Sequence, residues 1–195
     1  TEVLYQTTRA IGRAQSLEDI LKGVLEIVRF MGMSGASIRV FTEWDEAKHV
    51  PRLMNVYALS TTQAASEGEP EAEGAKAQPG VVAFKEMPVD VSALRGFLDD
   101  PRQHLLFVDA QDPESPMPDQ VRKHMLRVGH RGSLSTGLAA RGELIGLLSF
   151  NSEEPLTSFS QRYLQLITHT LSDQVSVTLD NLMLVEQSQL RARQL

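Results

Sequence analysis

The stretch RGSLSTGLAARGELIGLLSFNS, residues 131–152, decides the fold of this chain. It reads as two strands joined by Arg141-Gly142, a two-residue connection typical of a tight β-hairpin. Both faces of the second strand are apolar, with Leu144, Leu148 and Phe150 on one side and Ile145 and Leu147 on the other. A strand that is apolar on both faces lies inside its sheet, so we expect a layer of structure on each side of this sheet.

Further strands are expected on the N-terminal side of this hairpin. Residues 36–44 (ASIRVFTEW) alternate in the manner of a strand, and residues 53–59 (LMNVYAL) form a second strand across a polar turn. A short buried strand follows at 105–108 (LLFV). The chain therefore predicts a largely antiparallel sheet built from hairpins.

Helices are expected at both ends of the chain and in its middle. The first 30 residues predict one or two helices with a break near 12–16, where Ser16 can cap the second. Short helices are predicted near 92–98 and over 120–128, the latter capped by Asp119.

The last helix is predicted to be unusually long, because no Gly or Pro interrupts the pattern from Phe159 almost to the end. Its apolar stripe contains Leu164, Ile167, Leu171, Val175, Leu182 and Val185. About 35 residues make a helix on the order of 50 Å long. A globule of this size has a radius of gyration of about 16 Å, so the helix must project beyond the body. An exposed stripe of this kind usually pairs with another helix.

One segment, residues 61–79, differs from the rest in composition. It is rich in Ala, Glu, Gly and Pro, has no large apolar residue, and carries four Glu and one Lys. Such a stretch cannot bury enough apolar surface to offset its loss of conformational entropy. We expect a flexible surface insertion that holds half of the net charge of -6.

Composition excludes several classes of protein. The chain has 195 residues, 42% of them hydrophobic, and no cysteine. The missing thiols exclude disulfides, iron–sulfur clusters and a cysteine nucleophile. The acidic balance gives no basic footprint for nucleic acid, and no apolar run is long enough to span a membrane. No phosphate-binding, nucleophile-elbow or zinc-protease motif is present, so we expect no enzymatic activity.

Taken together, three stretches of the chain resemble the GAF domain, the small-molecule sensor module of signalling proteins. LYQTTRAIGRAQSLEDILKGVLEIV resembles the first helix of that family, and HRGSLSTGLAARGELIGLLSFNSEEPLTSFSQ resembles its central hairpin. YLQLITHTLSDQVSVTLDNLMLVEQ resembles its final helix. The resemblance covers roughly residues 4 to 187.

The resemblance implies an α+β fold with a central antiparallel sheet. The first and last helices would pack on one face, and short helices and loops would cover a pocket on the other. It implies a single sensor domain over residues 1–187, with 188–195 beginning a C-terminal signalling helix. The parent would be a cytoplasmic bacterial signalling protein, such as a histidine kinase of a two-component system.

The same resemblance implies where a ligand would lie. The wall of the pocket would come from Phe107, Asp109, Met117, Val121, His124, Met125, Arg131 and Ser133. Arg131 would face an anionic group or form a salt bridge to Asp109 or Asp112, and Asp109 would accept from a ligand or close an Asx-turn before Gln111. The methionines would line the pocket or fill the core. His124 and His130 would supply one axial ligand or a pair that contacts the ligand, or else be polar residues near a surface loop, and no histidine pair has a metal-site spacing.

Departures from the family pattern narrow the ligand. The enzyme known in the family, a free methionine sulfoxide reductase, works through cysteines, and bilin-binding relatives attach their chromophore through cysteine. Neither chemistry is open to this chain, although a non-covalent small molecule is compatible with it. The Asn-Lys-Phe-Asp-Glu set of cyclic-nucleotide-binding relatives is incomplete here, because Asn151 and Phe159 are followed by Ser160 and Gln161.

Two functions fit these observations. In the first, a small molecule in the pocket controls the last helix and an output domain of the same polypeptide. In the second, the domain binds no ligand and serves as a homodimerisation and spacer module. In both we expect a homodimer formed through the first and last helices, with no nucleic-acid or membrane contact by this segment.

Overall fold

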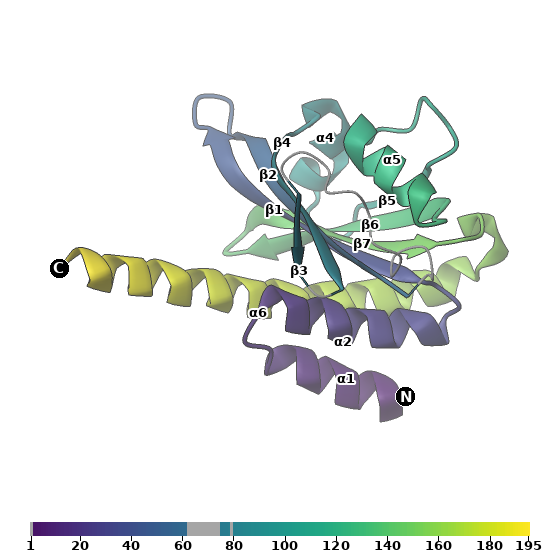
Figure 1. Ribbon diagram of the computed structural model, residues 1–195, viewed down its shortest axis with the longest axis horizontal. Coiled ribbons are helices and arrows are strands. Elements are labelled where there is room, and N and C mark those ends of the chain that lie inside the picture. The colour runs from purple at the N-terminus through teal and green to yellow at the C-terminus, as the bar shows by residue number, and fades with distance from the viewer. Residues whose placement is uncertain (1, 62–74, 79) are drawn as a thin grey trace.

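The computed structural model of the protein describes residues 2–61, 75–78 and 80–195 (Figure 1). Its frame is a seven-stranded antiparallel sheet with the strand order β3-β4-β2-β1-β7-β6-β5. The strands are β1 (Gly35–Asp45), β2 (Val50–Ser60), β3 (Ala75–Gln78), β4 (Val81–Pro88), β5 (Leu105–Asp109), β6 (Gly132–Ala140) and β7 (Glu143–Ser152). β7 pairs with β1 on one side and β6 on the other, which confirms the interior position predicted from its two apolar faces.

The predicted β6–β7 hairpin is confirmed, with one correction to its faces. Arg141 and Gly142 close it with φ of 53° and 77°, as a two-residue turn of this type requires. The register shifts between Leu138 and Ala139, opposite Ile145, and the alternation of β7 reverses there. Leu144 therefore packs in the same cluster as Leu147, and Ile145 in that of Leu148, contrary to the predicted faces.

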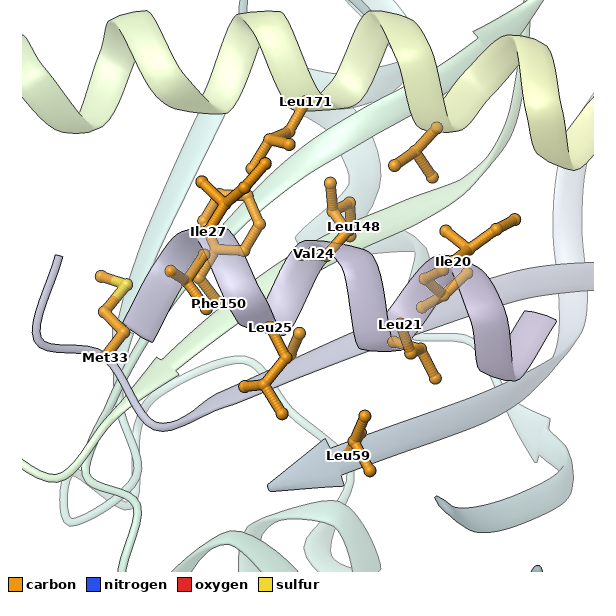
Figure 2. Packing of buried hydrophobic residues seen from close by; sticks show 14 of the residues in the cluster. Ile20, Leu21, Val24, Leu25, Ile27, Met33, Leu59, Leu148, Phe150 and Leu171 are labelled. Carbon is orange, nitrogen blue, oxygen red and sulfur yellow. The ribbon is translucent and has the colours of Figure 1, made fainter. Parts of the chain in front are cut away.

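One face of the sheet is covered by α2 (Leu17–Phe30) and α6 (Gln161–Gln194), and α1 (Glu2–Gly12) packs on the outside of these two helices (Figure 1). Figure 2 shows the packing, in which Val24 and Ile27 of α2 lie among Leu148, Phe150 and Leu171. The predicted cap of α2 is confirmed, because the Ser16 hydroxyl accepts from the Asp19 backbone N–H at 3.1 Å. This layer forms the larger of two hydrophobic clusters.

The final helix has the predicted length. α6 contains 34 residues, and its last buried residue is Leu179. Beyond Leu179 the helix continues to Gln194 with no buried residue, and Figure 1 shows its yellow end extending past the sheet. The helix therefore has a packed part and a projecting part.

The opposite face is covered by two short helices, α4 (Val91–Asp99) and α5 (Asp119–Arg127) (Figure 1). Both helices were predicted, but Asp119 is the first residue of α5 and not its cap. Pro118 holds the cap position and makes no side-chain cap bond. A short 3-10 helix, η1 (Leu156–Ser158), precedes α6.

Two strands were not predicted: β3 lies within the segment of unusual composition, and β4 directly follows it. β4 pairs with β2, and β3 pairs with β4 at the edge of the sheet. Residues 75–78, expected within the flexible insertion, are thus part of the sheet. Residues 62–74 and 79, the remainder of that insertion apart from Thr61, lie outside the described residues. Within the described ranges, no helix is both long and apolar enough to cross a lipid bilayer.

Candidate functional site

A second hydrophobic cluster lies between the sheet and the layer of α4 and α5. Phe97 of α4 and Val121 of α5 pack there against Met54 of β2 and Leu147 of β7. The full set of buried members is Phe41, Met54, Val56, Phe84, Met87, Leu94, Phe97, Val108, Ala110, Met117, Val121, Met125, Leu144 and Leu147. This cluster fills much of the space in which a ligand would be held.

The central strands carry a buried polar row beside this cluster. Ser37, Ser149 and Ser135 lie directly opposite one another across β1, β7 and β6, so they share one face of the sheet. The hydroxyls of Ser135 and Ser149 are hydrogen-bonded at 2.7 Å, and all three side chains are buried. The next row, Gly35, Asn151 and Ser133, is also buried. A sheet face this polar and this buried is unusual for a core that serves packing alone.

His130 packs on this polar region. A Cβ atom added at Gly35 would collide with the His130 ring, so glycine is required for the ring to lie there. The imidazole Nε2 is 3.1 Å from the Ser60 hydroxyl. Burial lowers the pKa of His130 to about 4, with the charge of His124 as a second cause, and a hydrogen bond to the Ser34 backbone acts in the opposite direction. His130 is therefore neutral at pH 7.

A small cavity opens between β1, β2 and β7 on one side and α4 on the other. Its empty volume is about 350 Å³, counted with its open mouth. Apolar groups make most of the lining, and Arg39 and Asp90 are its two charged residues. The lining residues are Arg39, Met54, Val89, Asp90, Ala93, Leu94, Phe97, Leu106, Pro116, Pro118 and Leu147.

Arg39 is the unusual member of this lining. It projects from β1 on the face opposite to Ile38 and Val40, which pack against the helical layer. Its side chain is 9% exposed and its Nε has no hydrogen-bond partner. Burial lowers the pKa of Arg39 to about 10, so the guanidinium is still charged at pH 7.

Most of the residues predicted for the pocket lie on the face of the sheet that α4 and α5 cover, in or near α5. Met117, Val121 and Met125 belong to the second cluster. The His124 ring lies edge-on to Phe84, with centroids 5.2 Å apart, and Ser133 is buried in β6. His124 and His130 are 8% and 3% exposed, so neither lies on a surface loop.

The other predicted residues lie at the edge of the sheet. Arg131 forms a salt bridge with Asp109 at 3.3 Å, and the Asp109 carboxylate accepts from the Gln111 backbone N–H at 3.0 Å. The hydrogen bond from Gln111 is the largest influence and lowers the pKa of Asp109; burial acts in the opposite direction, and the hydrogen bond and the charge of Arg131 lower the pKa further. Phe107 is 41% exposed, and strand alternation places it on the face opposite to Leu106, which lines the cavity.

The cavity residues of the inner strands were missed by the sequence analysis, above all Arg39. The alternation of 36–44 did place Arg39 on one face of its strand, but a charged residue in a strand normally marks a solvent-facing side. The signal that could have found it is the pairing of β1 with the doubly buried β7, since both faces of β1 are then covered.

Comparisons with known proteins agree with this architecture. A family model for the GAF domain matches residues 16–179, well over half of the chain. No curated protein matches.

Solved structures share the fold at low identity. The GAF domain of a two-component sensor histidine kinase from Bacillus halodurans is 13% identical, with a TM-score of 0.56, over 89% of this chain and 99% of that one. The GAF domain of an Acinetobacter phosphoenolpyruvate-protein phosphotransferase is 15% identical, with a TM-score of 0.56, over 94% of each chain. Residues 122 to 287 of a methyl-accepting chemotaxis protein are 15% identical, with a TM-score of 0.56, over 94% of this chain and 99% of that one. At such identities the likeness concerns the fold alone.

Proposed function

Because this chain belongs to the GAF domain family, we propose that it is a cytoplasmic sensor domain of a bacterial signalling protein. A small molecule binds between the sheet and the α4–α5 layer and biases the position of α6. The helix transmits this bias to an output domain of the same polypeptide. The domain itself is regulatory and catalyses no reaction.

The observation that carries this proposal is the direct bonding of the β6–β7 hairpin to α6. The Ala139 backbone N–H donates to the Ser176 hydroxyl at 3.2 Å, and Arg141 forms an ion pair with Asp180 at 3.1 Å. Ser176 and Asp180 are one helical turn apart and lie in the last turns of the packed part of α6, shortly before Leu182 and Met183. A displacement of the hairpin is therefore passed to the point from which the helix projects.

The same hairpin reaches the ligand side of the sheet. Leu147 of β7 lines the cavity, and Ser133 and Ser135 of β6 lie in the buried polar rows. A ligand that contacts these strands changes their twist or position, and a coupling of this kind needs unequal affinity for two arrangements of α6.

The absence of cysteine makes a direct test possible, because spin labels attach only at the cysteines that are introduced. One label is placed at Lys48→Cys, in the turn between β1 and β2, and one at Glu186→Cys, on the projecting part of α6. Native mass spectrometry first establishes whether the protein as purified carries a small molecule. The label-to-label distance is then measured for that sample and for protein stripped by unfolding and refolding.

We expect a bound molecule and a distance distribution that shifts when it is removed. A bound molecule with an unchanged distribution contradicts coupling to α6. A control pair, Lys48→Cys with Lys22→Cys on α2, should not shift in either state.

A second candidate function is the ligand-free dimerisation and spacer module. An exposed apolar stripe on α6 favours it: Tyr163, Leu166, Val177 and Leu184 are 51%, 64%, 59% and 45% exposed. We propose that this stripe, with α1 beside it, forms a homodimer interface in either function. Protein that carries no molecule and whose dimer is unaffected by stripping would support the spacer alone.

A further inference from the structure

We infer that the cavity at Arg39 binds an organic monoanion, a carboxylate attached to a compact apolar body. This inference rests on the proposed sensor function and names the ligand class of that site. It is carried by an unpaired buried cation, by the chemistry of the lining, and by the charge at the mouth.

The Arg39 side chain has no partner among the described residues. Among the residues that the structure describes, none forms a hydrogen bond or an ion pair with the Arg39 side chain, and its Nε is buried with no acceptor. A guanidinium carries five donors and cannot be neutralised at pH 7. Removing such a charge from water without pairing it is expensive, and proteins pair almost every buried charge. An anionic ligand supplies the partner that the fold leaves out.

The shape of the Arg39 guanidinium favours a carboxylate. The planar guanidinium matches a carboxylate in a bidentate arrangement, which fixes orientation as well as charge. Arg39 is held on an interior strand between β2 and β7, where Val56 and Leu147 are its cross-strand partners. A donor fork fixed on a sheet loses little freedom on binding.

The rest of the cavity lining is mostly apolar. Leu94 and Phe97 of α4 face Met54, Leu106 and Leu147 across the cavity. These walls offer nothing to a second polar group but suit an aliphatic or aromatic body.

The position of Asp90 favours a ligand that carries a single negative charge. Asp90 also lines the cavity, and its carboxylate accepts from the backbone N–H and the hydroxyl of Ser92 at 3.1 and 2.6 Å. This acid is directed to the start of α4 and forms no ion pair with Arg39. One cation beside one acid suits a monoanion and disfavours a phosphate dianion, because the second negative charge would face Asp90.

The test uses sodium benzoate and sodium hexanoate as probes, with benzamide as the uncharged analogue and inorganic phosphate as the dianionic one. Binding is measured with the full chain at pH 8, where inorganic phosphate is mainly the dianion, by thermal shift and by the Arg39 Nε–Hε resonance in nitrogen-15 NMR spectra. That resonance is assigned by its loss in Arg39→Lys. We expect saturable binding of one or both carboxylates, and at least tenfold weaker binding of benzamide and phosphate.

The variants are Arg39→Met and Arg52→Met. Arg52 is an exposed arginine on the neighbouring strand β2 and serves as the matched control. We expect Arg39→Met to weaken carboxylate binding at least tenfold and Arg52→Met to leave it unchanged. Arg39→Met should fold without ligand, because it replaces an unpaired charge with an apolar chain of similar length.

Several outcomes overturn the inference. They are a wild-type Arg39 resonance that no carboxylate moves, equal binding of benzamide and benzoate, and equal binding by Arg39→Met and the wild type. Should Arg39→Met fail to fold, the wild-type resonance decides alone.

Failure of this inference and failure of the sensor function give different results. Carboxylate binding that leaves the label distance to α6 unchanged overturns the sensor function and keeps the inference. A co-purified cation or neutral molecule that shifts α6 and leaves the Arg39 resonance in place overturns the inference and keeps the sensor function.

Discussion

Leu147 and Leu148 are consecutive residues of β7 that belong to opposite layers of the molecule. Leu147 lines the cavity beside Arg39, whereas Leu148 is fully buried in the cluster shared with α2 and α6. One strand thus separates the proposed ligand from the signalling helix by the thickness of a single backbone.

This pair gives the first prediction. Leu148→Ala should lower the free energy of unfolding by about 3–5 kcal/mol, because a packed side chain leaves a cavity that its neighbours cannot fill. Leu147→Ala should cost less, about 2–3 kcal/mol, since its side chain already borders an open space and has fewer contacts to lose. Urea denaturation of both variants measures the difference. An equal or larger cost for Leu147→Ala would show that the cavity is closed in solution.

The second prediction concerns the bond between the hairpin and α6. Ser176→Ala leaves the Ala139 N–H, next to the register shift of the β6–β7 ladder, without its acceptor. The free energy of unfolding should fall by about 1 kcal/mol, the net contribution of a hydrogen bond to a partly buried donor.

The matched control for this change is Ser172→Ala on the same helix. Ser172 is also buried, but its hydroxyl donates to the His169 carbonyl within α6. Its removal should cost less and should leave amide exchange at Ala139 unchanged. Faster exchange at Ala139 in Ser172→Ala, or none in Ser176→Ala, would contradict the proposed link.

The third prediction is a pH dependence from His130. Its pKa is lowered from 6.5 to about 4 by burial and by His124. Below pH 6.5 the His130 imidazole is therefore protonated in the unfolded chain, whereas in the folded protein it stays neutral until the pH approaches 4. The contribution to stability is complete above about pH 6.5 and falls as the pH drops towards 4. The difference between the pKa values of the unfolded and folded states corresponds to a loss of stability on the order of 3 kcal/mol.

Chemical denaturation between pH 4 and 7 tests this dependence. His130→Gln should flatten the slope whatever its effect on stability at pH 7. His49→Gln, a change at an exposed histidine in the β1–β2 turn, should keep the slope of the wild type. A wild-type slope retained in His130→Gln would assign the titration to another group.

The fourth prediction concerns the stripe on α6. We expect the wild type to sediment as a dimer at tens of micromolar and the double variant Leu166→Glu, Val177→Glu to sediment as a monomer. Both side chains are more than half exposed, so the folded monomer should keep its melting temperature. Gln165→Glu, an exposed change beside the stripe, should stay dimeric. A monomeric wild type would overturn the proposed interface.

The sequence predicted the elements whose signals are local. The turn at Arg141-Gly142, the cap at Ser16 and the uninterrupted α6 each depend on neighbouring residues, and each is confirmed. β4 was missed because its partner β2 lies across the unusual segment, so no hairpin signal joins them. Leu144 was assigned to the wrong face because a register shift within β7 is set by pairing with β6 and not by the alternation of β7 itself.

The candidate site was predicted less completely for a related reason. Val121 and Met125 belong to α5, whose apolar face is evident in the sequence, and Met117 lies just before that helix; all three do lie on the ligand side of the sheet. Arg39 could not be recognised from its own strand. Its burial results from the combined cover of α4 and the prolines before α5, which come more than 50 residues later.

The division of α6 into a packed and a projecting part has a mechanical consequence. Eleven residues follow Met183, the last residue of α6 that packs against the core, to the end of the helix at Gln194, an arm of about 16 Å. A tilt of about 5° at the anchored end displaces the tip by about 1.4 Å. In the proposed sensor function, α6 therefore acts as a lever that the β6–β7 hairpin holds at Ser176 and Asp180, and a small shift at this point becomes a larger displacement at the far end of the helix.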